Sequence, residues 1–553
     1  MSDATTTARR IVARLIAGGV RDVVLAPGSR SAPLAYAIAD AEAAGDLRVL
    51  IRLDERAVAF SALGLALATD TPVAIVTTSG TAVANLYPAL AEADADAVPL
   101  IALTADRPAE LWGTGANQTT NQLALFANVA RHCGHLCADE PDVEAEVDAA
   151  LSAARGLTSV APGPVQLNVS FRPPLTPDAA RLDDTTDAPA GPKAVASPQP
   201  ADLAPRADSA PITDLLRALD RPLVVAGDKA DQVAGIRAAL TALGAPIAAE
   251  PSSNLRDLPS AIGRIPELLG TPLAEQIGAV IIAGHPTLTR PATSLISRTD
   301  IPVVVLAPHG KPTDLTGGTA RILSVARTAA DDSRAEPPPV SAWLRSWHDA
   351  EAALPEPAPT ALQAAALAVW RACATAGLDL LIGSSSTIRA LDALVLTGQR
   401  SPGFRTWANR GLAGIDGTIA TGWGLARGLA RPVRIVLGDL TYLHDVSALL
   451  RGAAEADVDL QVIVLDDRGG SIFDGLEHGT LAATSPAAHD RFTRYFLTPQ
   501  AADITAIAAG FGATTHSLAV TPDDDRALAE LLAAPVRGRS VVHVDVSAKS
   551  QVR

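Results

Sequence analysis

Cysteines, aromatic residues and positive charges are scarce in this chain of 553 residues. Three cysteines, Cys133, Cys137 and Cys373, are too few for a disulfide framework and are typical of a reducing compartment. Only 3% of the residues are aromatic, against 48% hydrophobic residues in all, which favours helices and buried parallel strands over a β-sandwich. The formal net charge of −15 argues against nucleic-acid binding, whereas small anionic substrates need only a few well-placed arginines.

Long apolar runs are also absent. No run reaches the length that a membrane-spanning helix needs, and Met1–Thr5 is polar, unlike the apolar core of a signal peptide. We therefore expect a cytoplasmic protein without a membrane span. A chain of this length predicts about three to four domains.

What the sequence does contain is an alternation of two kinds of segment. Apolar runs of strand length alternate with Ala- and Leu-rich stretches of helical length, and strands that are apolar on both faces are typical of a parallel sheet covered by helices. We predict an α/β protein with three doubly wound parallel-sheet domains. The predicted strands are Asp22–Ala26, Arg48–Leu53, Pro72–Thr77, Pro99–Thr104, Val165–Val169, Pro222–Ala226, Ala279–Ala283, Ile301–Leu306, Asp379–Gly383, Val433–Leu437, Gln461–Leu465 and Ser540–Val546. The predicted helices include Thr6–Leu15, Ala57–Ala68 and Ala82–Ala93.

Changes in composition divide the chain into these domains. The stretch Pro173–Pro211 is rich in Pro, Ala, Asp and Ser and has no sustained period, so it predicts an interdomain linker. Proline clusters at Glu336–Pro339 and Pro355–Pro359 flank a second boundary. The predicted division is a domain at 1–180, a linker at 181–210, a domain at 211–345 and a domain at 355–553.

Aspartates follow two strands of the third predicted domain. Val433–Leu437 ends in Gly438–Leu440, with a helix expected to begin near Leu443, and Gln461–Leu465 ends in Asp466–Gly470. Because ligands bind at the carboxyl ends of strands in open parallel sheets, both acidic segments should lie at one ligand-binding edge. Carboxylate oxygens are hard ligands for Mg²⁺, which often shares them with phosphates. A single Gly-Asp after a strand is usually a turn, but the pair predicts a cradle for Mg²⁺ and a diphosphate.

A glutamate stands at a strand end of the first predicted domain. Glu55 follows the strand Arg48–Leu53, and two loops rich in glycine and serine, Pro27–Pro33 and Thr77–Thr81, follow two other strands. A lone glutamate in such a place is usually solvated. The three segments together predict a second polar edge.

This split arrangement resembles the thiamine diphosphate enzymes, which have a glutamate in an N-terminal pyrimidine domain and an acidic Gly-Asp motif in a C-terminal diphosphate domain. The resemblance assigns these two domains to 1–180 and 355–553, with a central α/β domain at 211–345. Within that superfamily, motifs over most of the chain resemble the 2-succinyl-5-enolpyruvyl-6-hydroxy-3-cyclohexene-1-carboxylate (SEPHCHC) synthases of menaquinone biosynthesis. The matching strings are Ala26–Pro33, Asp54–Arg56, Thr78–Asn85, Thr104–Pro108, Gly115–Gln118, Asn409–Gly417, Gly438–Thr441, His444-Asp445 and Gly469–Phe473.

The resemblance implies a role for each residue of the cofactor site. Glu55 hydrogen-bonds the aminopyrimidine of thiamine diphosphate, and Ile415 props the cofactor in its bent shape. Mg²⁺, or Mn²⁺ in its place, is held by Asp439, Asp467, the Gly469 carbonyl and the diphosphate. The other implied cofactor contacts are Pro27, Thr78, Gly438, Leu440 and Ile472.

The resemblance also implies a transferase reaction, in which 2-oxoglutarate is decarboxylated and its four-carbon succinyl-semialdehyde unit is added to isochorismate. Both substrates are dicarboxylates, which suits bidentate binding by arginines. By motif position, 2-oxoglutarate is bound by Arg389, Arg410 and Ser385. Isochorismate is bound or positioned by Ser29, Arg30, Arg107, Asn117, Gln118 and Arg290. The catalytic set is Glu55, Gln118, Arg389 and Arg410. In the superfamily the site forms between two subunits, so a homodimer or homotetramer is implied.

The chain departs from the family pattern at three places, and alternatives stay open. Asp466-Asp467 replaces an Asn-Asn pair, Thr289-Arg290 replaces a basic pair, and Ser384 stands where asparagine is common. The alternatives are another thiamine diphosphate-dependent 2-oxo acid decarboxylase, an acetolactate-synthase-like carboligase, or a catalytically silent sensor or scaffold. The cluster His132–Cys137 lacks the spacing of a structural zinc site, and a Gly-x-Gly-x-x-Gly motif after the first strand is absent.

Overall fold

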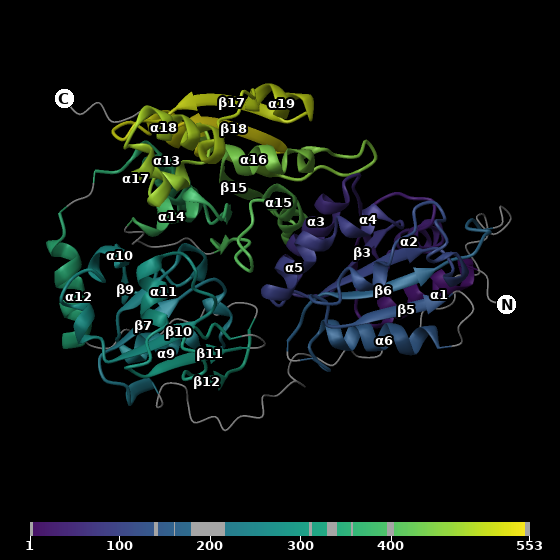
Figure 1. Cartoon of the computed structure of the whole chain (residues 1–553), viewed down its shortest axis with the longest axis horizontal. Helices are drawn as coiled ribbons and strands as arrows, with labels where there is room; N and C mark the ends of the chain where they lie inside the picture. Colours follow the sequence, from purple (N-terminus) through teal and green to yellow (C-terminus); the bar gives the residue numbers. More distant parts are fainter. Residues whose placement is uncertain are drawn as a thin grey trace. The chain divides into compact units, whose positions relative to one another are not determined.

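The computed structural model describes residues 4–137, 142–159, 161–177, 216–308, 312–328, 340–355, 358–394 and 403–547. Three six-stranded parallel sheets with flanking helices confirm the predicted α/β class (Figure 1). The contacts divide the chain into two units. The first contains Met1–Leu203, Asp416–Arg431 and Asp445–Val458, and the second contains Ala204–Ile415, Pro432–His444 and Asp459–Arg553. No helix in the described residues is long and apolar enough to cross a membrane.

The first sheet belongs to the first unit and has the order β2-β1-β3-β4-β6-β5. Its strands are β1 (Asp22–Leu25), β2 (Arg48–Ile51), β3 (Val73–Thr77), β4 (Leu100–Asp106), β5 (Cys133–Cys137) and β6 (Val165–Ser170). The helices are α1 (Ala4–Ala17), α2 (Ala32–Ala43), α3 (Glu55–Thr69), α4 (Thr81–Ala84), α5 (Tyr87–Ala95) and α6 (Val143–Ala154). Apolar residues of α1, α2 and α6 form one core with the sheet, and α3 and α5 lie on its other side (Figure 1).

One prediction for this region was wrong, and one strand was not predicted. The helix expected at Ala82–Ala93 is broken into α4 and α5, and Pro88, which has no backbone N–H, stands in the first turn of α5. The strand β5 was not predicted, because its Cys-Gly-His-Leu-Cys sequence lacks a continuous apolar run. In the structure β5 pairs with β6 at the edge of the sheet.

The helix α3 packs closely against α15 (Thr418–Leu429), which comes from the last third of the chain. A Cβ atom added at Gly64 of α3 would lie 2.0 Å from the Thr421 carbonyl oxygen, and one at Gly424 of α15 would lie 2.1 Å from the Ser61 carbonyl oxygen. Glycine at both positions therefore allows the two backbones to approach each other. The carboxylate of buried Asp445 caps the start of α15, because it accepts hydrogen bonds from the backbone N–H groups of Ile419 and Ala420 in the first turn of the helix.

The second unit contains the other two sheets. The central sheet has the order β12-β11-β10-β7-β8-β9 and the C-terminal sheet has the order β14-β13-β15-β16-β18-β17. The central strands are β7 (Pro222–Ala226), β8 (Ile247–Ala249), β9 (Ala261–Ile262), β10 (Ala279–Ala283), β11 (Val303–Ala307) and β12 (Arg321–Ser324). The C-terminal strands are β13 (Asp379–Ile382), β14 (Thr406–Trp407), β15 (Val433–Gly438), β16 (Leu460–Asp466), β17 (Thr514–Ala519) and β18 (Arg539–Asp545).

Helices cover both sheets of the second unit. Those of the central region are α9 (Ile236–Leu243), α10 (Ile265–Leu268), α11 (Arg290–Ile296) and α12 (Ala342–Ala353). Those of the C-terminal region are α13 (Ala361–Ala376), α14 (Ser386–Asp392), α16 (Asp439–His444), α17 (Glu477–Ala482), α18 (Pro486–Phe492), α19 (Ile504–Gly510) and α20 (Arg526–Leu532). The helix expected near Leu443 instead begins at Asp439, where an acidic side chain in the first turn favours the helix. The linker at 181–210 and the cluster Glu336–Pro339 lie outside the described residues.

Candidate active site

Three predicted cofactor residues lie at the carboxyl ends of adjacent strands in the first sheet. Pro27 follows β1, Glu55 follows β2 and Thr78 follows β3, and β1 pairs with both neighbours. A Cβ atom at Gly28 would lie 2.3 Å from the Thr78 Cβ, so only glycine allows these two loops to touch. The predicted polar edge therefore corresponds to the loops that follow β1, β2 and β3.

The backbone around Glu55 is held on both sides. Asp54 caps α3 by accepting hydrogen bonds from the Arg56 N–H at 2.9 Å and the Ala57 N–H at 3.3 Å. The second carboxylate oxygen of Asp54 accepts a 2.7 Å hydrogen bond from the Ser447 hydroxyl. Glu55, the first residue of the helix, is half-buried. The cap and the contact with Ser447 therefore hold in place the first turn of α3, which carries Glu55.

A second group of predicted residues lies beyond β3 and β4. Arg107 donates to the Ser79 hydroxyl at 2.6 Å and to the Gln118 carbonyl at 3.0 Å, and the Gln118 side-chain amide donates to the Ser79 carbonyl at 2.8 Å. Gln118 has a φ of 60°, which is strained for a residue other than glycine and marks a position fixed by its contacts. Burial and then the nearby charge of Arg107 lower the pKa of Arg30. Two guanidinium groups therefore share this edge, as an anion site requires.

The remaining residues predicted to bind or position isochorismate lie in different parts of the chain. Ser29 and Asn117 are exposed in loops of the first unit. Arg290 lies in the second unit at the start of α11, where it forms an ion pair of 2.9 Å with Glu477. Both partners of that pair are exposed, at 74% and 71% of their side-chain areas.

A buried polar network supports this edge and was not predicted. Gln122 accepts a 2.9 Å hydrogen bond from the Gly80 N–H and donates to Asn168 at 2.7 Å. Asn168 in turn donates to Asp106 at 3.0 Å, and Asp106 accepts from the Arg107 N–H at 2.7 Å. The available signal was Asn168 itself, a polar residue within an apolar strand, which when buried must find partners.

The second unit places the two predicted carboxylate ligands of the metal on adjacent strands. Asp439 and Asp467 follow β15 and β16, which are neighbours in the sheet. Asp439 is 5% exposed, and burial, followed by the negative charge of Asp467, raises its pKa to about 7. A divalent cation between the two carboxylates would relieve this repulsion, so the residues fit a bound Mg²⁺. Among the described residues no three His, Cys, Asp or Glu side chains form a metal site, so the other ligands would come from a carbonyl and the cofactor.

Asp466, where the family pattern has asparagine, makes contacts of its own. Its carboxylate pairs with His543 at 2.9 Å and accepts the Arg468 N–H at 2.9 Å. The hydrogen bond from His543 holds the pKa of Asp466 below its usual range. Gly469 has a φ of 127°, and a Cβ there would lie 2.2 Å from the Leu497 carbonyl oxygen. Only glycine fits where the predicted carbonyl ligand stands.

The apolar and glycine residues predicted to contact the cofactor surround these carboxylates in sequence. Gly438 ends β15, Leu440 lies in the first turn of α16, and Ile472 lies in a short 3₁₀ helix after β16. Ile415 stands in the segment between β14 and α15. Gly438, Leu440, Ile472 and Ile415 are all half-buried.

The two arginines predicted to bind 2-oxoglutarate, Arg389 and Arg410, follow the adjacent strands β13 and β14. Arg410 is 2% exposed and donates one hydrogen bond from Nη2 to the Thr287 hydroxyl. Its Nε and Nη1 groups have no partner among the described residues. Burying such donors unpaired is unfavourable, and an anionic ligand would satisfy them.

Arg389 lies on α14 and donates a 3.2 Å hydrogen bond to the carbonyl of Ser385, the residue that precedes the helix. The residue as a whole is exposed, but burial around its guanidinium and then the charge of Arg410 lower its pKa. The Ser384 hydroxyl donates to the Asn409 carbonyl at 2.6 Å and ties the ends of β13 and β14 together. Arg389 and Arg410 therefore form a second pair of neighbouring cations, on the same sheet as the metal ligands.

Comparisons with known proteins identify thiamine pyrophosphate enzyme domains in both the N-terminal and the C-terminal part of the chain. Two family models match, the thiamine pyrophosphate enzyme N-terminal TPP binding domain at residues 5–125 and the C-terminal TPP binding domain at residues 390–546. Curated proteins named 2-succinyl-5-enolpyruvyl-6-hydroxy-3-cyclohexene-1-carboxylate synthase, from Arthrobacter sp. (strain FB24) and Renibacterium salmoninarum, are each 43% identical to this chain. The matches cover 98% and 97% of this chain, and 89% and 93% of those proteins.

The fold also has a solved counterpart. The crystal structure of benzoylformate decarboxylase from Polynucleobacter necessarius matches with a TM-score of 0.66 over 99% of this chain and 98% of that one. At 16% sequence identity this likeness shows the fold alone.

Proposed function

The chain belongs to the SEPHCHC synthase family of thiamine diphosphate enzymes, and we propose that it decarboxylates 2-oxoglutarate and adds the succinyl-semialdehyde unit to isochorismate in a Mg²⁺-dependent reaction. The product would be SEPHCHC, an intermediate of menaquinone biosynthesis. The observation that carries the choice of 2-oxoglutarate is Arg410, a buried arginine whose Nε and Nη1 atoms have no partner among the described residues and which lies beside a second cation.

The residues described fit the cofactor. Thiamine diphosphate, when bound, supplies the nucleophilic carbon and the electron sink for decarboxylation. Asp439, Asp467 and the Gly469 carbonyl would hold the metal, and Glu55 would hydrogen-bond the aminopyrimidine. The contacts along the cofactor would come from Pro27, Thr78, Ile415, Gly438, Leu440 and Ile472.

The chain's own arginines would divide the two substrates between them. Arg389 and Arg410, with Ser385, would bind the carboxylates of 2-oxoglutarate, because guanidinium groups in a buried site bind carboxylates strongly and in fixed geometry. Isochorismate would be bound or positioned by Ser29, Arg30, Arg107, Asn117, Gln118 and Arg290. A simple decarboxylase or an acetolactate-synthase-like enzyme takes a donor with one carboxylate, which does not need two neighbouring cations.

The assembly and location are part of the same proposal. Glu55 belongs to one unit of the chain, and Asp439 and Asp467 belong to the other. We therefore propose a homodimer or homotetramer with the active site between subunits, which a concentration-independent monomer mass in sedimentation would contradict. None of the three cysteines, all of which lie in the described residues, forms a disulfide, in keeping with a cytoplasmic location that cell fractionation would test.

The test of this function is isochorismate consumption, followed by ultraviolet absorbance with purified protein, thiamine diphosphate, Mg²⁺ and 2-oxoglutarate. We expect loss of the isochorismate signal only when all components are present, and recovery of the adduct by mass spectrometry. Omitting Mg²⁺ after EDTA treatment should stop the reaction. Cofactor binding without isochorismate consumption would reject the proposed acceptor.

Replacing Arg410 tests the assignment of the donor site. Arg410→Ala should raise the apparent KM for 2-oxoglutarate by about 10- to 100-fold, because a hydrogen bond to a charged group contributes about 1.5–3 kcal/mol. The KM for isochorismate should change little. Arg371→Ala removes an exposed arginine of α13 and is the matched control. If only the isochorismate kinetics changed in Arg410→Ala, the division of substrates would be wrong.

A further inference from the structure

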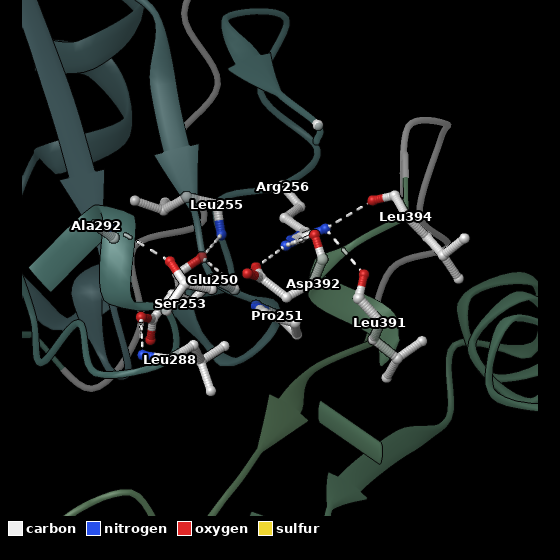
Figure 2. Close-up of polar contacts among 12 residues, drawn as sticks. Glu250, Pro251, Ser253, Leu255, Arg256, Leu288, Ala292, Leu391, Asp392 and Leu394 are labelled. Atoms are coloured by element: carbon white, nitrogen blue, oxygen red, sulfur yellow. Dashed lines mark hydrogen bonds and ion pairs between the residues drawn. The ribbon is translucent and has the colours of Figure 1, made fainter. Parts of the chain in front are cut away.

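Contacts of the central region reach the segments that carry Arg389 and Arg410, and three of them bear on these two arginines. Two of them come from the short segment Glu250–Arg256, which follows β8 and contains a 3₁₀ turn at Pro251–Ser253 (Figure 2). The third comes from Thr287, whose backbone N–H is bound by Glu250 of this segment. The segment and both arginines belong to the second unit of the chain. Neither composition nor motif pointed to it.

The first contact fixes the helix of Arg389. Arg256 is buried and forms an ion pair with Asp392, the last residue of α14. Arg256 also donates to the carbonyls of Leu391 at 3.3 Å and Leu394 at 3.1 Å (Figure 2). Because the last carbonyls of a helix lack partners within it, a cation placed there both satisfies them and favours the helix dipole. Arg256 therefore anchors the carboxyl end of α14.

The second contact fixes the strand that leads to Arg410. The side-chain oxygen of Asn254 accepts hydrogen bonds from the Thr406 N–H and the Thr406 hydroxyl, each at 2.9 Å. Its amide donates to the Thr406 carbonyl at 3.1 Å. Thr406 begins β14, and Arg410 follows three residues after the strand ends.

The third contact leads to the Arg410 guanidinium itself. One carboxylate oxygen of Glu250 accepts hydrogen bonds from the Thr287 N–H at 2.7 Å and the Leu288 N–H at 2.8 Å. The Thr287 hydroxyl accepts the one hydrogen bond of Arg410 that the structure shows. Figure 2 shows Glu250 reaching Leu288 on one side of the cluster while Arg256 reaches α14 on the other.

The chemistry of Glu250 is unusual for a residue that serves folding alone. The residue is 6% exposed, burial raises its pKa to about 7, and its second carboxylate oxygen has no partner among the described residues. A buried acid with an unsatisfied oxygen is unfavourable for stability, and an apolar residue of similar size would fill the same space. Such groups are retained where function requires them.

We propose that Glu250 is a positioning residue for the donor substrate, which holds Thr287 in place and through it aims the Arg410 guanidinium. The proposal rests on the proposed function, because it assigns Arg410 to 2-oxoglutarate. It gives the central region a part in donor binding: this region orients the arginine without touching the substrate.

The kinetic test compares variants along the contact from Glu250 to Arg410. Glu250→Ala should raise the KM for 2-oxoglutarate about 10-fold or more, while the KM for isochorismate and the affinity for thiamine diphosphate change little. Glu250→Gln keeps an oxygen that accepts both N–H groups, so it should restore most of the affinity for 2-oxoglutarate. Thr287→Val removes the acceptor hydroxyl and should reproduce the effect of Glu250→Ala.

A matched control and a double mutant separate positioning from folding. Glu351 accepts a 2.6 Å hydrogen bond from the Gly263 N–H in the same region, so Glu351→Ala removes a similar clamp and should leave the 2-oxoglutarate KM unchanged. If Glu250 acts through Arg410, Glu250→Ala should add less than about 2-fold to the KM of Arg410→Ala. Fully additive effects, or an unchanged KM in Glu250→Ala and Thr287→Val, would overturn the proposal.

A structural readout covers the case in which the proposed function fails. Crystal structures of the wild type and of Glu250→Ala should show the Arg410 side chain and the Thr287–Leu288 backbone displaced in the variant. A wild-type protein that consumes no 2-oxoglutarate would reject the donor assignment, and an Arg410 that stays in place would independently reject the positioning role. If Glu250→Ala does not fold, Thr287→Val and Glu250→Gln carry both measurements.

Discussion

Glu55→Gln should lower kcat by about 100-fold or more while leaving the affinity for thiamine diphosphate nearly unchanged. The carboxylate of Glu55 stands on a capped helix end and would make a charge-assisted hydrogen bond with the aminopyrimidine. An amide of the same shape keeps the packing but cannot make that bond, and charge-assisted bonds are roughly twice as strong as neutral ones. Steady-state kinetics and calorimetric titration of the cofactor with Mg²⁺ measure the two quantities separately.

The control for this variant is Glu42→Gln, which makes the same chemical change on the exposed face of α2. It should leave kcat, KM and cofactor affinity at wild-type values. Turnover of Glu55→Gln close to that of the wild type would remove Glu55 from the mechanism. Loss of cofactor binding in Glu55→Gln would instead assign the residue to binding.

The second large effect is expected at the crossing of α3 and α15. Gly64→Ala would bring a methyl group to 2.0 Å from the Thr421 carbonyl oxygen, which is backbone and cannot rotate away. Overpacking of this kind typically costs about 1–3 kcal/mol, so the apparent melting temperature should fall by roughly 3–10 °C. Because α3 also carries Glu55, kcat should fall at temperatures where the variant is still folded.

Gly510→Ala is the matched control, because Gly510 ends α19 and a Cβ there would meet nothing within 4 Å. Alanine favours a helix over glycine by about 1 kcal/mol, so this variant should be as stable as the wild type or slightly more stable. Differential scanning calorimetry measures both variants. A melting temperature for Gly64→Ala equal to that of the wild type would show that the two helices separate more easily than their packing implies.

The buried strands were predictable because their chemistry is local. Pro222–Ala226 and Ala279–Ala283 match β7 and β10 at both ends, since an apolar run between turn residues is sufficient to define a strand buried on both faces. Of the strands at the sheet edges, β2 was predicted, whereas β5, β9, β12, β14 and β17 were not. Thr514–Ala519 is mostly exposed and begins with four polar residues, so its strand state depends on pairing with β18.

The residues of the candidate site likewise fall into those that could be placed from the sequence and those that could not. Glu55 and Asp439 could be placed from the sequence because the loop or turn that follows a parallel strand lies at the ligand-binding edge. Gln122 and Glu250 could not, because their roles depend on partners 42 and 37 residues away, Gly80 and Thr287. A single polar residue in a loop carries no sign of which distant N–H it will accept.

The packing of α3 against α15 also bears on how the chain is made. The buried run Ala57–Ala66 of α3 leaves the ribosome roughly 350 residues before α15 is synthesised. At about 5–20 residues per second, the helix waits roughly 20–70 s for its partner. During that time its apolar surface is available to chaperones, and the support beneath Glu55 is completed only when translation is nearly finished.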